Sequence, residues 1–282
     1  TVLRQGVVTL AAPRQEVTAD SLTEAMIGGA LTTTPRRGSA GDGPVLVHCE
    51  GLQVQGESGS GLRHASFSIQ GGALVAVAGV EGNGQRELLR AVAHNLPPRR
   101  GALEVTGPIA FVPEDRTTEG LIPTLSLTEN VVLGVGRVAP WLRGRGVRQV
   151  NWRAAGARTT SLLREFDVRA EGANATAESL SGGNQQKLLI ARALERRPRV
   201  LVAENPTRGL DLQAAADVHA HLRAAAAAGA AVLIYSNDLD EVLELGDRIF
   251  VAANGVIIEA PVGADRHRLG EMMLQSGRTD AR

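Results

Sequence analysis

The chain has 282 residues, of which 43% are hydrophobic, and its 30 Lys and Arg residues balance 30 Asp and Glu residues. This composition is ordinary for one large or two modest globular domains, and the zero net charge argues against an extended nucleic-acid-binding surface. The longest apolar runs, such as residues 73–78, are far shorter than the roughly 18 residues that a membrane-spanning helix needs. A single cysteine, Cys49, excludes an internal disulfide framework and suits a reducing compartment.

The first thirty residues have the same predicted order of elements as the end of the chain. "TVLRQGVVTLA" predicts strand, turn at Gly6 and strand, with a short helix at "TEAMIGG", and "FVAANGVIIEA" repeats the hairpin with a turn at Gly255 before "GEMMLQSG". Two interpretations stay open: a duplicated unit, which would make residues 1–30 the tail of a preceding copy, or two unrelated β-hairpins. Because the chain starts at Thr1, we expect it to be part of a longer protein.

The polar stretch at 31–44, "LTTTPRRGSAGDGP", predicts a flexible linker, after which a second unit begins near Val45. Its segments "VLVHCEGLQVQ", "LRHASFSIQ" and "ALVAVAG" have the alternating or continuous apolar pattern of strands. The loop "GVEGNGQR" follows the third strand, and "QRELLRAVAHNL" then begins a helix. A strand, a glycine-rich loop and a helix in this order are the context of a phosphate-binding loop.

Further along, "IAFVP", "RVLVAEN", "AAVLIYSND" and "DRIFVAA" predict buried strands with helical segments between most of them. This alternation indicates an α/β fold with a mainly parallel sheet. The pattern at about 117–197 is largely helical and predicts an inserted subdomain, although it includes an arginine run at 143–148 that is typical of a solvated loop. Residues 261–282 are expected to form a C-terminal tail.

The segment "LSGGNQQKLLIARAL", residues 180–194, carries the strongest functional signal. Ser181, Gly182 and Gly183 open an amphipathic helix, where backbone N–H groups, the helix dipole and a hydroxyl favour an anion. Combined in order with the glycine loop and with "ENPTRGLD", the segment resembles the ATP-binding cassette (ABC) family, whose signature is LSGGQ. The resemblance covers about residues 45–260.

A narrower group within that family is similar at several more motifs. "GVEGNGQREL", "VPEDRTTEGL", "LSLTENVVLG", "LSGGNQQK" and "PTRGLD" resemble the second, C-terminal cassette of tandem ATPases that serve sugar and nucleoside importers. The spelling "GNGQ" favours nucleosides. The resemblance implies an ABC-type P-loop fold at 45–282, with a mainly parallel core, an antiparallel β subdomain and the helical insert.

The resemblance also implies two sets of ATP-binding residues. One set belongs to the glycine loop and the other to the signature and the turn that follows it: Gly79, Gly82, Asn83, Gly84, Gln85 and Arg86, and then Ser181, Gly182, Gly183, Asn184 and Asp211. In this family two cassettes pair head to tail, so that the loop of one cassette and the signature of the other hold the same ATP.

The glycine loop departs from the family pattern at its two chemical positions. Lys187 in the signature helix is the only lysine of the chain, so Gln85 stands where a lysine would contact the phosphates. Arg86 stands where a hydroxyl would bind Mg²⁺, about 100° further around the helix than Gln85. The backbone N–H groups of the loop are retained, and such a nest can bind phosphate weakly without the lysine.

The expected catalytic positions of the family are altered as well. Glu204 is the one candidate for Mg²⁺, through a water, while Asn205 occupies the place of the general base and cannot accept a proton from the attacking water. Asn237 occupies the place of the switch histidine, and Glu114 that of the glutamine after the core strand. "GLQVQGES", where such cassettes stack adenine, contains no aromatic residue.

We therefore predict a degenerate cassette that hydrolyses ATP poorly or not at all, with Ser181 and Gly183 completing the ATP site of a partner cassette. The implied partners are a first cassette, a transmembrane permease and, indirectly, a solute-binding protein, at the cytoplasmic face of the plasma membrane. Two alternatives stay open. One is an active ATPase in which Arg86 and Glu204 replace the lost groups. The other is a nucleic-acid-linked cassette protein, against which the neutral charge speaks.

Overall fold

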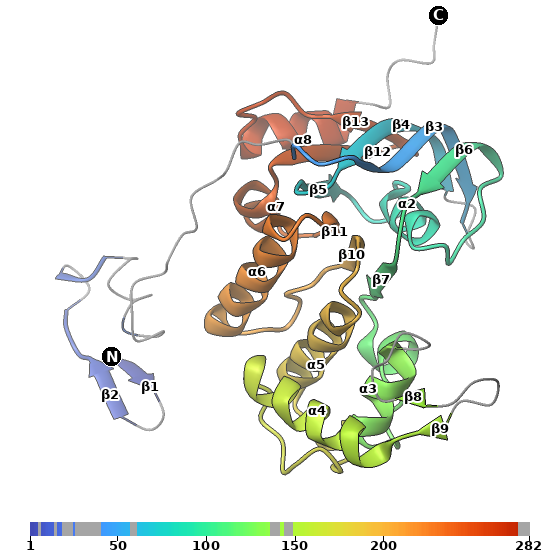
Figure 1. Cartoon of the computed structure of the whole chain (residues 1–282). Coiled ribbons are helices and arrows are strands. Elements are labelled where there is room, and N and C mark those ends of the chain that lie inside the picture. Colours follow the sequence, from blue (N-terminus) through green and yellow to red (C-terminus); the bar gives the residue numbers. More distant parts are fainter. Residues whose placement is uncertain are drawn as a thin grey trace, which may run out of the picture.

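The computed structural model describes residues 1–4, 7–13, 16–18, 25, 41–56, 61–135, 142–143 and 149–275 (Figure 1). Several predicted features therefore lie outside the described residues. They are the linker at 31–40, the short helix predicted at 23–29 apart from residue 25, most of the arginine run at 143–148, and the end of the tail at 276–282. Within the described part, no helix combines the length and the apolar character needed to cross a bilayer.

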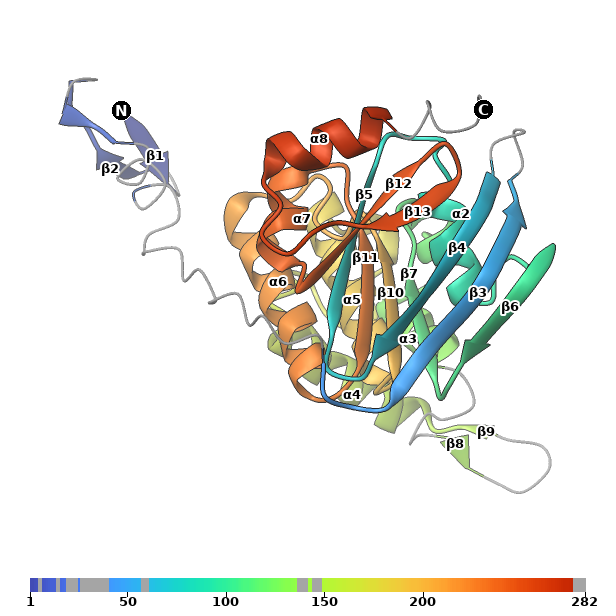
Figure 2. The same ribbon diagram turned by 90° about the horizontal axis from the view of Figure 1, so that it is seen from above.

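A nine-stranded sheet organises the second unit, and five of its strands form the parallel core that the sequence predicts (Figure 2). In spatial order these are β12 (Arg248–Ala253), β5 (Leu74–Gly79), β11 (Ala231–Tyr235), β10 (Val200–Glu204) and β7 (Ile109–Val112). Each residue of β5, β10 and β11 is buried. Parallel strands covered on both faces require such continuous apolar runs, which is why the sequence identified them.

An antiparallel part extends the sheet beyond β12, as predicted. It contains β13 (Val256–Glu259), β4 (Gly61–Gln70), β3 (Val45–Gln55) and β6 (Arg100–Val105). Strands β3 and β4 pair antiparallel, as do β3 and β6, whereas β13 and β4 meet in parallel through Val256 and His64. The strand β6 was not identified from the sequence, because every residue in it is exposed or half-buried and its apolar pattern is weak.

Two hydrophobic clusters cover opposite faces of the sheet, and β5 contributes alternate residues to each. The helix α2 (Gln85–Val92) packs Leu88 and Leu89 among β3, β5, β10 and β11 in one cluster. The other cluster lies beneath α5 (Gly182–Glu195), α6 (Leu212–Ala227), α7 (Leu239–Leu245) and α8 (Arg266–Gln275). Because side chains alternate along each strand, α2 covers the same face of the sheet onto which β3 and β4 direct their buried residues.

The inserted part is mainly helical, as expected, and lies at the end of the molecule away from β3 and β6 (Figure 1). It contains a π-helical turn η2 (Arg116–Gly120), α3 (Leu127–Val135), α4 (Trp152–Glu165), the 3-10 turn η4 (Ala177–Ser179) and α5. One difference from the prediction is a pair of two-residue strands, β8 (Leu142–Arg143) and β9 (Gln149–Val150), which join antiparallel.

Both predicted hairpins are present. At the start of the chain β1 (Val2–Arg4) pairs antiparallel with β2 (Val7–Leu10), and near the end β12 pairs with β13. The second turn is made by Asn254 and Gly255, which adopt φ angles of 49° and 79°. Left-handed conformations at both positions match the twist of the strands and explain the Asn-Gly pair. The helix predicted to begin in "QRELLRAVAHNL" is α2, which ends at Val92, before His94 turns to a φ of 60°.

Candidate functional site

The glycine loop joins the end of β5 to the start of α2 and is tied to the β12–β13 turn. Gly82 and Gly84 adopt φ angles of 88° and 93°, a left-handed conformation that glycine accepts without steric cost. The Asn83 N–H donates to the Val80 carbonyl at 3.2 Å, and Asn83 Oδ1 accepts the N–H of Asn254 at 2.9 Å. The loop therefore has the folded shape of a phosphate cradle, held by backbone contacts.

The side chain of Gln85 closes this loop from the inside. Its Nε2 donates to the Val80 carbonyl at 3.0 Å and to the Tyr235 hydroxyl at 3.2 Å, and the residue is only 2% exposed. Tyr235 in turn donates its hydroxyl proton to Asn237 Oδ1. Gln85 Oε1 is buried without a hydrogen-bond partner among the described residues. The position that would carry a lysine thus contributes a buried neutral amide.

The acid at the end of β10, Glu204, is held by an arginine that the sequence analysis did not single out. Arg90 Nε lies 3.1 Å from Glu204 Oε1 and Arg90 Nη2 lies 3.4 Å from Oε2, while the Glu204 side chain is fully buried. The Glu114 N–H donates to Oε2 at 3.2 Å. Arg86 approaches Glu204 Oε1 at 3.8 Å, and Glu119 accepts hydrogen bonds from Arg86 and Arg90 at 3.2 and 2.5 Å. Two arginines and two glutamates therefore alternate in one network.

The charges of this network determine how its groups titrate. Burial alone would lower the pKa of Arg90, but its hydrogen bonds and charge interactions with Glu204 and Glu119 raise that pKa overall. Burial raises the pKa of Glu204, and the hydrogen bond and charge of Arg90 limit that rise. A buried carboxylate rarely occurs without a partner, and Arg90 follows Arg86 by one helical turn. These two signals were available in the sequence and would have pointed to Arg90.

The residue at the general-base position, Asn205, has a backbone role. It adopts a φ of 42°, which asparagine tolerates better than most residues, and its N–H donates to the Tyr235 carbonyl at 2.7 Å. Asn205 Oδ1 accepts the N–H of Asn237 at 2.8 Å, while its Nδ2 is buried without a partner among the described residues. Asn205 thus joins the ends of β10 and β11, and it is not among the residues that line the cavity beside the glycine loop.

A second pair of arginines connects the cavity to the signature segment. Arg208 pairs with the Glu114 carboxylate, and the Arg208 carbonyl accepts a hydrogen bond from Arg116 Nη1 at 3.4 Å. The Arg116 guanidinium lies against Gly182, where an added Cβ would be only 2.7 Å from Nη2. Any larger side chain at Gly182 would displace Arg116. Neither arginine was identified as a site residue from the sequence, because Arg116 begins the short π-helical turn η2 and Arg208 lies in the turn after β10, where no periodic pattern marks them.

The signature residues cap the start of α5. Ser181 Oγ accepts hydrogen bonds from the N–H and Nδ2 of Asn184 at 3.5 and 2.9 Å, and Asn184 Oδ1 accepts the N–H of Arg169 at 2.9 Å. Asp211 caps the next helix, α6, by accepting the Ala214 N–H at 2.8 Å. The first N–H groups of α5 have no partners within the helix, which leaves them for an external anion.

The structure brings some predicted site residues together and leaves others apart. A cavity of about 390 Å³ lies between the glycine loop with α2 on one side and the ends of β7, β10 and β11 on the other. The residues that line it are Gly56, Glu81, Gly82, Gln85, Arg86, Glu87, Arg90, Leu96, Glu114, Arg208, Tyr235 and Asn237. The signature residues and Asp211 are not part of its lining. In one copy of the chain, therefore, the loop and the signature belong to separate surfaces.

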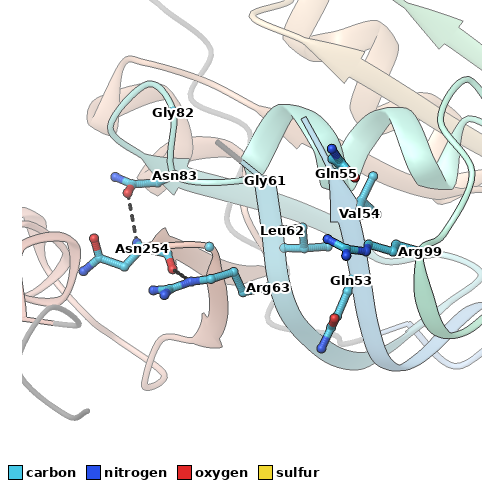
Figure 3. A pocket seen from close by; sticks show the side chains of 11 residues that line it. Gln53, Val54, Gln55, Gly61, Leu62, Arg63, Gly82, Asn83, Arg99 and Asn254 are labelled. Carbon is cyan, nitrogen blue, oxygen red and sulfur yellow. Dashed lines mark hydrogen bonds between the residues drawn. The ribbon is translucent and has the colours of Figure 1, made fainter. Parts of the chain in front are cut away.

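A larger cavity of about 620 Å³ lies on the other side of the loop, against β3 and β4 (Figure 3). Its polar lining consists of arginines and carboxamides: Gln53, Gln55, Arg63, Asn83, Arg99 and Asn254. Arg63 Nε donates to the Asn254 carbonyl at 2.6 Å, as the dashed line in Figure 3 shows. Among the residues that line it, none is aromatic.

Mg²⁺ is the metal that the fold implies, and the residues at the loop do not fit it. Mg²⁺ requires oxygen ligands in near-octahedral geometry, usually carboxylates with waters and phosphates. Both oxygens of Glu204 accept hydrogen bonds from Arg90, and Arg86 replaces the hydroxyl of the loop. Across the described ranges, no group of three or more His, Cys, Asp or Glu side chains is placed to hold a metal ion.

Known proteins resemble this chain in sequence and in structure. The family model for ABC transporters matches residues 62–208. Similar curated proteins include the nucleoside import ATP-binding protein NupA of Lactococcus lactis (32% identical over 97% of this chain and 57% of that protein). The guanosine import ATP-binding protein NupO of Bacillus subtilis is 34% identical over 100% of this chain and 58% of that protein. The ribose import ATP-binding protein RbsA 1 of Streptomyces avermitilis is 36% identical over 94% of this chain and 51% of that protein. The chain thus spans little more than half the length of these relatives.

Solved structures confirm the fold. The ATP-binding subunit of an ABC transporter superposes with a TM-score of 0.67 at 21% identity, covering 82% of this chain and all of that one. A dimeric cassette in a post-hydrolysis state, bound to ADP and Pi, gives a TM-score of 0.66 at 23% identity over 78% of this chain. The fold of this chain, with its nine-stranded mixed sheet and covering helices, is therefore that of these cassettes. The chain belongs to the ABC transporter family.

Proposed function

We propose that this chain is the C-terminal cassette of a tandem ATP-binding protein that drives import of nucleosides or sugars. The functions for which the relatives are named support this, and so does the extent of the alignments. They cover 94–100% of this chain but 51–58% of each relative, and each includes residues before the family match at 62–208. On this proposal residues 1–30 are the tail of the preceding cassette, 31–44 the linker, and 45–282 the second cassette, with its helical insert at about 117–197 and tail at 261–282.

We further propose that this cassette works through its signature and is impaired at its own glycine loop. The carrying observation is the ion pair of Arg90 with the fully buried carboxylate of Glu204, at 3.1 Å. Phosphoryl transfer depends on positioned charge and an oriented water. At this loop Gln85 is neutral and turned inward, and Asn205 is engaged with backbone groups. The signature retains Ser181 and Gly183 at an open helix start.

In the assembled importer, Ser181, Gly183 and Asp211 would complete the ATP site on the glycine loop of the first cassette. The proposed partners are that cassette, a transmembrane permease contacted through residues 114–130, and a solute-binding protein that acts through the permease. The chain would then work at the cytoplasmic face of the plasma membrane. The zero net charge supports a role without nucleic acid.

Two assays on the same samples test whether the glycine loop is impaired: phosphate release reports hydrolysis, and a thermal-shift titration reports nucleotide binding. The 282-residue chain is titrated with ATP with and without Mg²⁺, and we expect no turnover above the blank in either condition. Saturation at about 100 times the dissociation constant would stabilise the fold by about 2.7 kcal/mol. Sustained turnover by the chain alone would contradict the proposal and favour an independent ATPase.

The signature role is tested in the intact importer by Ser181→Arg, which places a bulky cation at the helix start. We expect loss of ATP hydrolysis by the whole assembly, although the substitution lies outside this chain's own loop. Arg153→Ser on α4 is the control, because Arg153 is exposed. This substitution changes one surface charge and lies outside both sites. Full hydrolysis in the Ser181→Arg importer would refute the signature role.

A further inference from the structure

We propose that the cavity at the glycine loop binds a nucleoside polyphosphate without a divalent metal ion, and that the Arg86 guanidinium supplies the positive charge at the phosphates. The inference rests on the proposed function in one respect, namely that a nucleotide is what this loop receives. It concerns the chemical form of that nucleotide. The metal-free form would distinguish this site from an ATP site that requires Mg²⁺.

The cavity already contains the cations that a polyphosphate needs. Arg86 and Arg90 from α2 and Arg208 from the turn after β10 all line it, beside the backbone of Gly82. Three carboxylates, those of Glu81, Glu87 and Glu114, line it as well. The side chains of Arg86 and Arg208 are 47% and 68% exposed. Planar guanidinium groups bind phosphate oxygens in pairs of hydrogen bonds. The cavity therefore offers movable cations next to a nest of backbone N–H groups.

The three arginines differ in how firmly they are held. Arg90 is 19% exposed and is fixed by Glu204 and Glu119, at 3.1 and 2.5 Å. Arg86 makes one hydrogen bond to the half-exposed Glu119 at 3.2 Å and a longer contact to Glu204 at 3.8 Å. Exposed ion pairs contribute little to stability. Arg86 can exchange Glu119 for a phosphate at small cost, whereas Arg90 remains with Glu204.

The same network excludes the metal. For Mg²⁺ to bind Glu204, the carboxylate must release Arg90, which would leave a largely buried guanidinium without its partner. A divalent ion on the phosphates would also lie close to the Arg86 cation and be repelled by it. A metal-free polyphosphate meets neither obstacle. The site therefore selects the metal-free form of the nucleotide.

Isothermal titration of the 282-residue chain with ATP tests the inference, in excess EDTA and in excess MgCl₂ at matched ionic strength. We expect ATP to bind in EDTA at least about tenfold more tightly than in Mg²⁺, a difference of about 1.4 kcal/mol. Arg86→Ser removes the guanidinium and restores a hydroxyl. We expect it to lose about tenfold or more in EDTA and to reverse the preference toward Mg²⁺, while Arg86→Lys retains binding in EDTA. Arg153→Ser is the charge-matched control and should behave as the original chain.

The outcomes separate this inference from the proposed function. Tighter binding in Mg²⁺ than in EDTA, or unchanged binding in EDTA by Arg86→Ser, would overturn the inference and leave the signature role intact. Absence of binding in both conditions would also overturn it, again without affecting the Ser181→Arg test. Phosphate release in Mg²⁺ would overturn the proposed function itself. Thermal unfolding of each variant shows whether it is folded, and Arg86→Lys provides the comparison if Arg86→Ser is not.

Discussion

Replacing Arg90 by methionine is the most direct test of how the site is held together. The substitution keeps much of the aliphatic stem but leaves the Glu204 carboxylate buried without its main partner. Removing one member of a buried ion pair costs about 3–5 kcal/mol. The lower end applies here, because Arg86 at 3.8 Å and the Glu114 N–H at 3.2 Å still face the carboxylate. We expect the free energy of unfolding to fall by about 3 kcal/mol at neutral pH.

The pH dependence of that loss identifies its cause. Without Arg90, burial holds the pKa of Glu204 above the value of about 4.3 that a glutamate has in the unfolded chain. The folded state then keeps a proton that the unfolded state has released. The free energy of unfolding of Arg90→Met should therefore decrease, relative to the original chain, as the pH rises above about 4.3, and be least impaired in mild acid.

Urea unfolding followed by circular dichroism at several pH values measures both effects. A loss of about 3 kcal/mol corresponds to a fall in Tm of roughly 6–12 °C for a domain of this size. Adding Glu204→Gln to Arg90→Met removes the buried charge and should recover much of the stability and flatten the pH dependence. Arg153→Met is the exposed control and should stay within about 0.5 kcal/mol. A loss below about 1 kcal/mol without pH dependence would refute the assignment of this pair as a buried ion pair.

Three further predictions concern single sites. The pKa of His219 is raised, because its hydrogen bond and charge interaction with the buried Glu241 outweigh the effect of burial, which alone would lower it. The protonated His219 therefore stabilises the fold. This contribution is complete below about pH 6.5 and is lost as the pH rises through the pKa of the folded state. Tm measured across that range should fall more for the original chain than for His219→Gln, and equal slopes would contradict the pairing. Burial raises the pKa of the Cys49 thiol to about 11. A disulfide reagent at mild alkaline pH should therefore label one thiol per chain in urea and almost none in the folded state. Rapid labelling of the folded chain would contradict this and show that this part of β3 opens. Gly84→Ala should lower the free energy of unfolding, measured in urea, by at least about 1 kcal/mol. The reason is that Gly84 has a φ of 93° and that an added Cβ would lie 3.2 Å from the Gly61 carbonyl oxygen. Gly172 has open space around it, so Gly172→Ala should be nearly neutral.

The local motifs and the class of fold were accessible from the sequence alone. The apolar runs of β5, β10 and β11 have no alternation because both faces of a parallel sheet are covered, and that pattern is visible in single segments. The glycine loop and the signature are each a single unbroken stretch of sequence. Each can be identified locally, because the strand or helix start that it requires lies only a few residues away. The turn at Gly255 follows from the Asn-Gly pair for the same local reason.

The interior of the candidate site was decided by tertiary packing. Arg90 and Glu204 are separated by 114 positions, and Gln85 and Tyr235 by 150, so no local pattern couples them. They meet because α2 packs across β10 and β11, which brings an arginine of the helix onto the buried acid and turns the glutamine inward. The sequence could show that a lysine and a general base are missing from their places. Only the packing of the helix against the sheet determines that an arginine neutralises the remaining acid, because a charge without water must find its partner in whatever element covers it.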